Sequence, residues 1–338
     1  MNDAAPVTPV ISRRHALRIL QILVTAGLVA ALLWLVDWPS VLDVLRQVNP
    51  GWVVVIVALV FGERAMLNVK WRVLLANGGI DIGFGRLFRI QLAANALGTF
   101  LPGSIGVDAF RISGLWRFRE KRHEAVAATL LDRISTVLAT VAVSGAMVVL
   151  GASSLVGRNT VMQIIIGGAV ILIAGAFFLS GTGRALARAS IQWLPAGLRD
   201  RLMQVGAAGW LIAGHPGSIV VTIVTSLGAV GLRVVIGKCL LLACGVDVGF
   251  ATLGVVLPVV WATTMLPISI GGVGVQDAAY VVLLGYAGIS APIAVVVSLL
   301  DHILSRTPII PGALFWRDVV PVGHNASTAV RNRNLHEQ

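Results

Sequence analysis

Nine charged or titratable residues stand inside long apolar segments of the sequence, where an unpaired charge is costly. On insertion scales an Arg, Lys or Asp at the centre of a membrane helix costs about 2.5–3.5 kcal/mol, so such groups usually pair or line a polar interior. The residues are Glu63, Arg64, Asp132, Arg133, Arg233, Lys238, Asp301, His302 and Arg306. Guanidinium and ammonium groups hold phosphate, and carboxylates balance them when no anion is bound. The set therefore favours a site for an anionic group, and structural pairing between the acids and the arginines is an alternative of equal weight.

Two helix-breaking motifs with similar sequences accompany these charges. Residues 101–111 read LPGSIGVDAFR, and residues 266–277 read LPISIGGVGVQD. Proline removes a backbone donor and clashes with the preceding helical turn, and glycine loosens what remains. Irregular backbone at membrane depth is tolerated only where protein or a water-filled cavity covers it. Two such breaks in corresponding positions of two half-chains therefore indicate a transporter binding site.

Each motif carries a serine and an acid that have both a binding and a structural interpretation. Ser104 and Ser269 would bond oxygens of a lipid headgroup, or cap the half-helix that follows. Asp108 and Asp277 would bind a cationic headgroup, take up a proton, or hold exposed backbone amides of their own break. Arg111, at the end of the first motif, is a candidate to hold a phosphate.

The composition describes the kind of protein that must position these groups. Of the 338 residues, 57% are hydrophobic and 12% are charged, and the mean hydropathy is +0.89. That profile is typical of a polytopic helical membrane protein. The formal charge of +11 does not indicate a nucleic-acid partner, because the basic residues fall between the apolar segments, where they set topology. Cys239 and Cys244 are expected to be small buried hydrophobes, and no spacing of His, Cys, Asp or Glu indicates a metal site or a cofactor.

Six apolar segments are long enough to be spanning helices, and the positive-inside rule places both termini in the cytoplasm. The segments cover residues 19–36, 51–70, 124–151, 161–180, 217–244 and 290–316. We therefore expect a single transmembrane domain at 17–316 in the plasma membrane, between cytoplasmic tails at 1–16 and 317–338. Residues 37–50 form a short external segment, and residues 181–216 form a cytoplasmic linker. Lys70 and Arg72 are interpreted as interfacial residues whose charged ends reach the membrane surface.

Two further apolar stretches are too short to cross a bilayer and predict re-entrant helical hairpins. Residues 87–100 have basic residues on both flanks, which places both ends of the first hairpin on the cytoplasmic side. Residues 248–276 carry no charge and are split by the second motif, and their flanks contain acids but no Lys or Arg, which suits the outer side. The predicted fold class is an all-α polytopic membrane protein with about six spanning helices and two re-entrant hairpins.

The two halves of the domain, at about 51–157 and 217–316, repeat one another beyond the two motifs. Arg64 matches Arg233, Lys70 matches Lys238, residues 79–84 match 245–250, and residues 130–134 match 299–303. The offsets stay between 165 and 169. Because the second span is predicted to run inward and the fifth outward, the halves have opposite orientation. This inverted-topology repeat is found in many secondary transporters, which bind substrate near the midplane between the halves.

The same residues carry a family resemblance. The first half resembles the flippase-like transmembrane region of lysylphosphatidylglycerol synthetases at Asn95, at the first motif with Asp108 and Arg111, and at Asp132 with Arg133. Residues 266–277 resemble that family's second signature. The resemblance covers about residues 12–316 and implies a protein that moves a lipid between leaflets. Asp277 and Val107 depart from the family pattern, in which a glutamate and a second glycine are frequent. Because the chain ends soon after the last predicted span, the soluble aminoacyl-transfer domain and its activity are not expected.

The sequence thus predicts a lipid flippase or transporter, rather than an enzyme, that moves an anionic phospholipid or lipid-linked headgroup between leaflets. In this hypothesis Arg64, Arg233 and Lys238 offset phosphate charge, while Asp132 and Asp301 balance the empty site. The candidate binding residues are Arg64, Asn95, Ser104, Asp108, Arg111, Asp132, Arg133, Arg233, Lys238, Ser269, Asp277, Asp301 and His302. Among them His302 would titrate in a proton-linked cycle, or serve as a hydrogen-bonded packing residue.

Two other functions stay open at this point. An integral-membrane glycosyl or acyl transferase acting on a lipid-linked substrate would need a water-accessible acid pair, for which Asp37 and Asp43 are the external candidates. A non-transporting accessory subunit of a lipid-modifying pathway would act through a partner enzyme, and homo-oligomers are also compatible with the sequence. No nucleotide-binding motif is present, so direct use of ATP is not expected.

Overall fold

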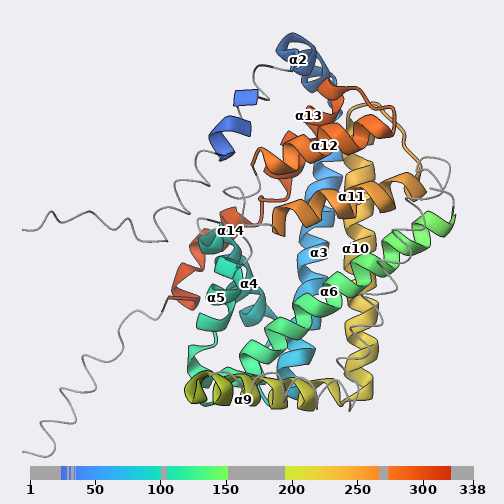
Figure 1. Ribbon diagram of the computed structural model, residues 1–338. Helices are drawn as coiled ribbons and strands as arrows, with labels where there is room; N and C mark the ends of the chain where they lie inside the picture. The colour runs from blue at the N-terminus through green and yellow to red at the C-terminus, as the bar shows by residue number, and fades with distance from the viewer. Residues whose placement is uncertain are drawn as a thin grey trace, which may run out of the picture.

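A computed structural model describes residues 24–28, 30–31, 34, 36–99, 105–150, 195–265 and 273–320, and all regular secondary structure within these ranges is helical (Figure 1). Four stretches are long and apolar enough to cross a membrane: Pro50–Asn77, Trp116–Leu150, Pro216–Ala243 and Ala291–Leu314. They coincide with four of the predicted spans. The predicted span at 161–180 lies outside the described residues, and the one at 19–36 lies largely outside them.

The centre of the molecule is a pair of long helices, α3 (Pro50–Asn77) and α10 (Pro216–Ala243), which lie side by side (Figure 1). The amide of Asn49, before α3, donates to the carbonyl of Ala243 at the end of α10 (3.1 Å). At the other end of the pair, the Asn77 side chain donates to the hydroxyl of Ser218 near the start of α10. The two helices therefore run antiparallel over their whole length.

Both central helices end in the same way. Gly79 and Gly245, at φ +73° and +75°, adopt the left-handed conformation that favours glycine. The following amides fold back, from Ile80 to the carbonyl of Leu75 (2.9 Å) and from Val246 to the carbonyl of Leu241 (3.0 Å). These are helix C-terminal caps in which the 6→1 bond satisfies a terminal carbonyl. Each cap turns the chain into a second helix.

Those second helices form two short helix pairs, α4 (Phe84–Gly98) with α5 (Ile105–Ser113) and α11 (Phe250–Met265) with α12 (Val275–Tyr286). None of the four is long enough to span a bilayer, which needs about 20 residues. Because α3 and α10 are antiparallel, the two pairs start from opposite ends of the molecule. The breaks inside the pairs, at 100–104 and 266–272, lie outside the described residues, together with Ser104 and Ser269.

The first pair is closed by an unusually tight contact. A β-carbon placed on Gly98 would lie 2.6 Å from the backbone and side chain of Val107, so α4 and α5 meet where residue 98 has no side chain. We expect Gly98→Ala to force the pair apart and to destabilise the protein by about 1–3 kcal/mol, the usual cost of overpacking. The measurement is the thermal unfolding midpoint in detergent.

A matched control for this prediction is Gly285→Ala in α12, where a β-carbon meets nothing within 4 Å. Equal midpoints for the two variants would show that the α4–α5 contact tolerates the added methyl group.

The final predicted span is divided in the structure. α13 (Ala291–Leu304) ends in a turn at 305–308, and α14 (Ile309–Leu314) and the 3₁₀ turn η5 (Trp316–Asp318) follow. Pro308 explains the interruption, because it lacks an amide proton and its ring clashes with the preceding helical turn. α14 then packs on α4, with Gly312 against the backbone of Leu92. The predicted span at 290–316 is thus present as Ala291–Leu314, with a turn at 305–308 inside it.

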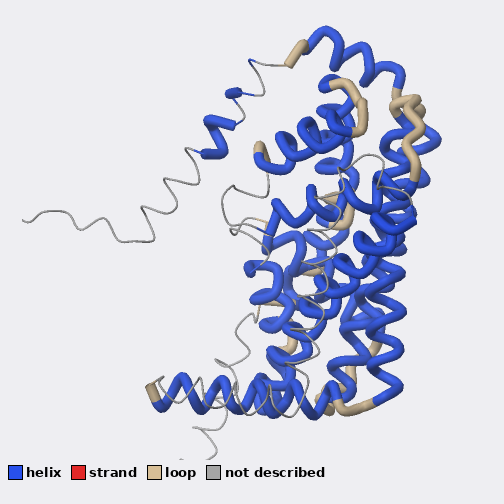
Figure 2. Tube along the Cα trace, turned by 45° about the vertical axis from the view of Figure 1, so that its right-hand side comes forward, coloured by secondary structure: helices blue, strands red, loops and turns tan. Residues whose placement is uncertain are grey.

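The remaining helices lie at the two ends and across the middle. α2 (Trp38–Gln47), in the predicted external segment, occupies one end, and α9 (Ala196–Ala213), within the predicted linker, lies across the other (Figures 1 and 2). The 3₁₀ helix η1 (Trp116–Lys121) leads into α6 (Arg122–Leu150), which packs on α10, α11 and α9.

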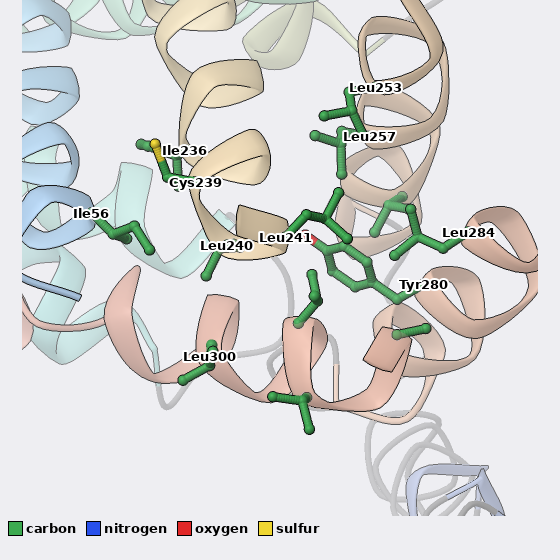
Figure 3. Packing of buried hydrophobic residues seen from close by; sticks show 14 of the residues in the cluster. Ile56, Ile236, Cys239, Leu240, Leu241, Leu253, Leu257, Tyr280, Leu284 and Leu300 are labelled. Atoms are coloured by element: carbon green, nitrogen blue, oxygen red, sulfur yellow. The ribbon is translucent and has the colours of Figure 1, made fainter. Parts of the chain in front are cut away.

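The apolar core forms one large cluster toward each end of the α3–α10 pair. The cluster nearest α2 joins α3 and α10 to α11, α12 and α13, for example through Ile56, Leu240, Leu257 and Tyr280 (Figure 3). The cluster nearest α9 packs the end of α3 against α4 and α6. Outward faces of the long helices are also apolar, including the exposed side chains of Val54, Leu130 and Val224. Apolar surface of this kind on helices that can span a bilayer is suited to contact with lipid.

Candidate functional site

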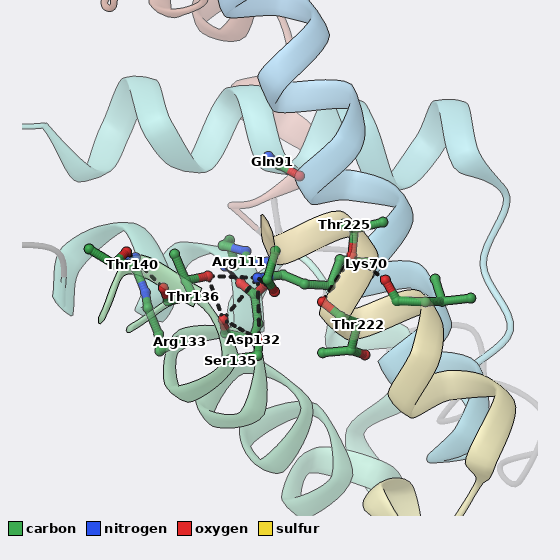
Figure 4. Close-up of polar contacts among 12 residues, drawn as sticks. Lys70, Gln91, Arg111, Asp132, Arg133, Ser135, Thr136, Thr140, Thr222 and Thr225 are labelled. Carbon is green, nitrogen blue, oxygen red and sulfur yellow. Dashed lines mark hydrogen bonds and ion pairs between the residues drawn. The ribbon is translucent and has the colours of Figure 1, made fainter. Parts of the chain in front are cut away.

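A first polar cluster gathers side chains from α3, α5 and α6 and is defined here as Lys70, Asp108, Arg111, Asp132, Arg133 and Thr136. Figure 4 shows Lys70, Arg111, Asp132, Arg133 and Thr136. At its centre Lys70 Nζ lies 2.9 Å from Asp132 Oδ1, and Arg111 Nη1 lies 2.8 Å from Asp132 Oδ2. The Lys70 side chain is 0% exposed, and its ammonium also donates to Thr136 (2.6 Å) and to Ser226 on α10 (3.2 Å). The interpretation of Lys70 as an interfacial residue was therefore wrong.

The outer part of the first cluster is a second, more open ion pair. Arg133 donates to both carboxylate oxygens of Asp108, from Nη2 at 2.9 Å and from Nε at 3.0 Å. The Arg133 side chain is 38% exposed, whereas Arg111 is 6% exposed and stacks 4.0 Å from the ring centroid of Trp71. Three cations and two acids give this cluster a formal charge of +1, so it suits an additional anion.

A second polar cluster, defined here as Glu63, Arg233, Gln276, Asp277, Tyr280, Asp301, His302, Ser305 and Arg306, gathers around α13. Asp301 accepts from Arg233 (3.2 Å), Gln276 (2.9 Å), Tyr280 (3.0 Å) and Ser305 (2.8 Å). These four donors use the acceptor capacity of a carboxylate, so Asp301 is held in place. Arg233 also faces Glu63 of α3 (3.5 Å) and the ring of Trp261 (5.1 Å).

Asp277 sits at the edge of the second cluster and stabilises its own helix start. One carboxylate oxygen accepts from the amide of Gly274 (2.8 Å), and the other lies 3.2 Å from His302 Nε2 and accepts from Ser298. The sequence analysis gave three interpretations for Asp277. The structure shows the contact expected from one of them, in which the acid accepts from a backbone amide of its own motif, that of Gly274.

The two clusters repeat the same pairs at one constant offset along the sequence. Arg111 contacts Asp132 and Tyr280 contacts Asp301; Arg133 contacts Asp108 and His302 contacts Asp277. In each cluster a cation of the central helix pair contacts an aspartate and the hydroxyl group four residues after it. Lys70 contacts Asp132 and Thr136. Arg233 contacts Asp301 and Ser305. The sequence match of 130–134 with 299–303 already pairs Arg133 with His302, whereas the pairing of Arg111 with Tyr280 was not apparent because the two residue types differ.

Before the breaks the offset between the halves is slightly smaller. Arg72 donates to the carbonyl of Ile82 (3.1 Å), and Lys238 donates to the carbonyl of Val248 (2.6 Å). Lys238 and Arg72 thus make the same kind of contact, each with a carbonyl ten residues later, whereas the sequence analysis matched Lys238 with Lys70. Lys238 also pairs with Asp247, so it fastens the helix end and lies apart from both clusters.

Arg64, on α3, stands between the two clusters. Its guanidinium is close enough to interact electrostatically with Glu63 and Arg233 of the second cluster and with Arg111 and Arg133 of the first. Among the described residues it has no ion pair, and its buried Nε atom has no hydrogen-bond partner. Arg64 is half-buried, and Glu63 offsets part of its charge without forming an ion pair with it, so its guanidinium has donors left to bind an anion.

The structure thus brings together most of the residues chosen from the sequence. The first cluster contains Asp108, Arg111, Asp132 and Arg133, and the second contains Arg233, Asp277, Asp301 and His302. Asn95 is not among them, since its amide donates to the carbonyl of Gln91 in its own helix (2.8 Å). Lys70, Gln276, Tyr280 and Ser305 were missed. The constant offset between the halves would have pointed to Tyr280 and Ser305.

The chain is similar to known membrane proteins over most of its length. The family model described as "Lysylphosphatidylglycerol synthase TM region" matches residues 18–312. A "UPF0104 membrane protein" of Methanothermobacter thermautotrophicus is 22% identical over 311 residues, which cover 84% of this chain and 90% of that protein. No solved structure matches.

Proposed function

Because the chain belongs to the lysylphosphatidylglycerol synthase transmembrane-region family of membrane proteins, we propose that it translocates a lipid with an anionic headgroup between the two leaflets. The observation that carries this proposal is the position of Arg64, a guanidinium without an ion-pair partner among the described residues, between the two polar clusters. Headgroup phosphate is the lipid group that such a cation would bind.

We propose that the domain is an inverted-topology repeat with two re-entrant helix pairs, within about six spans and with both termini in the cytoplasm. Three observations support this arrangement: the antiparallel α3 and α10, the two short helix pairs that start from opposite ends, and the contacts that recur at a constant offset in the two clusters. In transporters of this architecture, the substrate binds near the bilayer midplane at the repeat interface. The interactions of Arg64 with both polar clusters support a site between the halves.

In the proposed cycle the permanent ion pairs hold the helices while the headgroup exchanges at Arg64. Asp132 and Asp301 are each saturated by cations or donors of their own half, so they fix the geometry rather than contact the lipid. The phosphate is bound by Arg64 and by the more exposed guanidinium of Arg133. The acyl chains stay in the bilayer along the apolar outer faces of the long helices. Only the polar headgroup then crosses through protein.

Arg64→Gln tests this function directly. A hydrogen bond to a charged group contributes about 1.5–3 kcal/mol, so translocation of a fluorescent phosphatidylglycerol is expected to slow by about tenfold to a hundredfold. The purified chain is reconstituted into phosphatidylcholine vesicles, and the labelled lipid is bleached from the outer leaflet with dithionite.

The matched control is Arg46→Gln, which removes an exposed arginine on α2 whose partner is Asp43. Its translocation rate is expected to equal that of the unaltered protein. A folded Arg64→Gln protein that still moves the lipid at the original rate would contradict the proposal. Failure of the unaltered protein to move any labelled lipid would also contradict it.

No observation favours the enzymatic alternative in its original form. Asp37 and Asp43, the candidate acid pair, both lie at or in α2, where Asp37 accepts from Ser40 and Asp43 pairs with Arg46 on the exposed surface. Each acid thus has an ordinary helix-surface partner.

A further inference from the structure

The two clusters differ in chemistry at one equivalent position. Arg133 and His302 occupy the same place relative to Asp108 and Asp277. The arginine is charged at every physiological pH, whereas histidine is the side chain whose charge normally changes between about pH 5 and 8. One half therefore has a permanent ion pair where the other half has a titratable one.

His302 lies between a cation and an acid, one at each ring nitrogen. Its Nδ1 atom lies 2.7 Å from Nη1 of Arg306. A guanidinium can only donate, so Nδ1 accepts this hydrogen bond and the ring proton is on Nε2. That nitrogen lies 3.2 Å from Asp277 Oδ1. The imidazole thus lies between a guanidinium at Nδ1 and a carboxylate near Nε2.

Several other charged or titratable groups face this part of α13 from the helices packed against it. They are Asp277 and Tyr280 of α12, Arg233 of α10, Glu63 of α3, and Asp301 and Arg306 of the same segment. Asp301 already accepts from four donors, one of them Arg233. The group that must respond to a proton on Nδ1 is therefore Arg306, because two donors and two positive charges would then face each other.

We propose that His302 is the proton-binding switch of this protein, and that its protonation displaces Arg306 and couples headgroup movement to proton uptake. A proton from water binds Nδ1, the resulting imidazolium pairs with Asp277, and the proton returns to water when Arg306 rebinds. The coupling to headgroup movement rests on the proposed translocation function. The displacement of Arg306 on protonation of His302 concerns only the second cluster and does not depend on that function.

A structural route connects the switch to the opposite helix pair. Arg306 lies in the turn at 305–308 that joins α13 to α14, and α14 packs on α4 with Gly312 against Leu92. Movement of Arg306 changes the conformation of the turn, and with it the packing of α14 on α4. A proton bound in the second cluster would in this way alter the helix pair that carries the first cluster.

The first test is a distance measurement that needs no transport. Spin labels are placed at Leu299 on α13 and Leu314 on α14, both exposed, after Cys239 and Cys244 are replaced by alanine. Between about pH 8 and pH 5.5, the label distance is expected to change in the protein with His302. It is expected to stay constant in His302→Gln, which keeps a donor and an acceptor, and in His302→Arg, which copies the first cluster. His215→Gln, on an exposed histidine before α10, is expected to keep the pH response.

The second test measures translocation of fluorescent phosphatidylglycerol by the same proteins in vesicles. Acidification is expected to accelerate it by about fivefold or more, in line with common coupling free energies, and His302→Gln is expected to abolish this acceleration. A label distance that responds to pH without any lipid movement would support the switch and overturn the translocation function. Lipid movement at a rate independent of pH, with a constant label distance, would overturn the switch and leave the function standing.

Discussion

Asp132→Ala is expected to give the largest loss of stability among single substitutions in the described residues. The change leaves Lys70 and Arg111, two buried cations, without the carboxylate to which both bond, at 2.9 and 2.8 Å. Breaking a buried ion pair by removing one partner costs about 3–5 kcal/mol, because the remaining charge stays desolvated. We therefore expect a strongly lowered unfolding midpoint in detergent, or a protein that does not accumulate in the membrane.

Two further variants separate this cause from a general intolerance at the site. Asp132→Ala combined with Lys70→Met removes one of the stranded cations and should recover part of the loss. Asp43→Ala removes an acid from an exposed ion pair and is expected to change stability by at most about 1 kcal/mol. If Asp132→Ala and Asp43→Ala unfold at the same temperature, the first cluster is not the buried network described above.

Arg233→Ala is the counterpart in the second cluster, with an added effect between the two central helices. It leaves Asp301, 2% exposed, and Glu63, 11% exposed, without their shared cation. Since Glu63 belongs to α3 and Arg233 to α10, the change also removes an ion pair across the central helix interface. A loss of about 3–5 kcal/mol is expected, again seen as a lower unfolding midpoint.

Conservative replacement gives a graded version of this test. Arg233→Lys keeps the positive charge but loses the two-branched geometry that reaches Asp301 and Ser305 together. Its midpoint should fall between those of Arg233→Ala and the unaltered protein. An Arg233→Ala protein as stable as Arg233→Lys would contradict the assignment of Arg233 as the neutralising group of this cluster.

The sequence predicted those features of the fold that depend on local composition. Apolar length indicated the four described spans. The sequence analysis also matched residues 79–84 with 245–250, and the structure shows that matched helix caps stand there, at the ends of α3 and α10. Lys70 was misplaced for a physical reason. Charge near the end of a span is compatible both with a side chain that reaches the surface and with one that turns inward, and only the packing of α6 and α10 decides. The turn at 305–308 inside the last span includes Pro308, and the sequence analysis gave only the bounds of that span.

The sequence predicted which charged residues form the candidate site better than it predicted which of them contact one another. The cost of charge at membrane depth pointed to most of the acids and bases that the two clusters contain. Their partners required the fold. Asp132 pairs with Arg111 and also with Lys70, which the sequence analysis had interpreted as an interfacial residue. Tyr280 carries no charge at neutral pH, so a search for charges passed over it, and only its contact with Asp301 reveals its role.

In each cluster a tryptophan ring lies against an arginine, so the fluorescence of these two tryptophans can report on the two clusters. Trp71 faces Arg111 at 4.0 Å, and Trp261 faces Arg233 at 5.1 Å. The emission of an excited indole depends on the charge beside its ring, so each tryptophan senses the electrostatic state of its own half. Chains that keep one of these two and carry phenylalanine at every other tryptophan position would let fluorescence follow either half separately in an intact bilayer, without an attached dye.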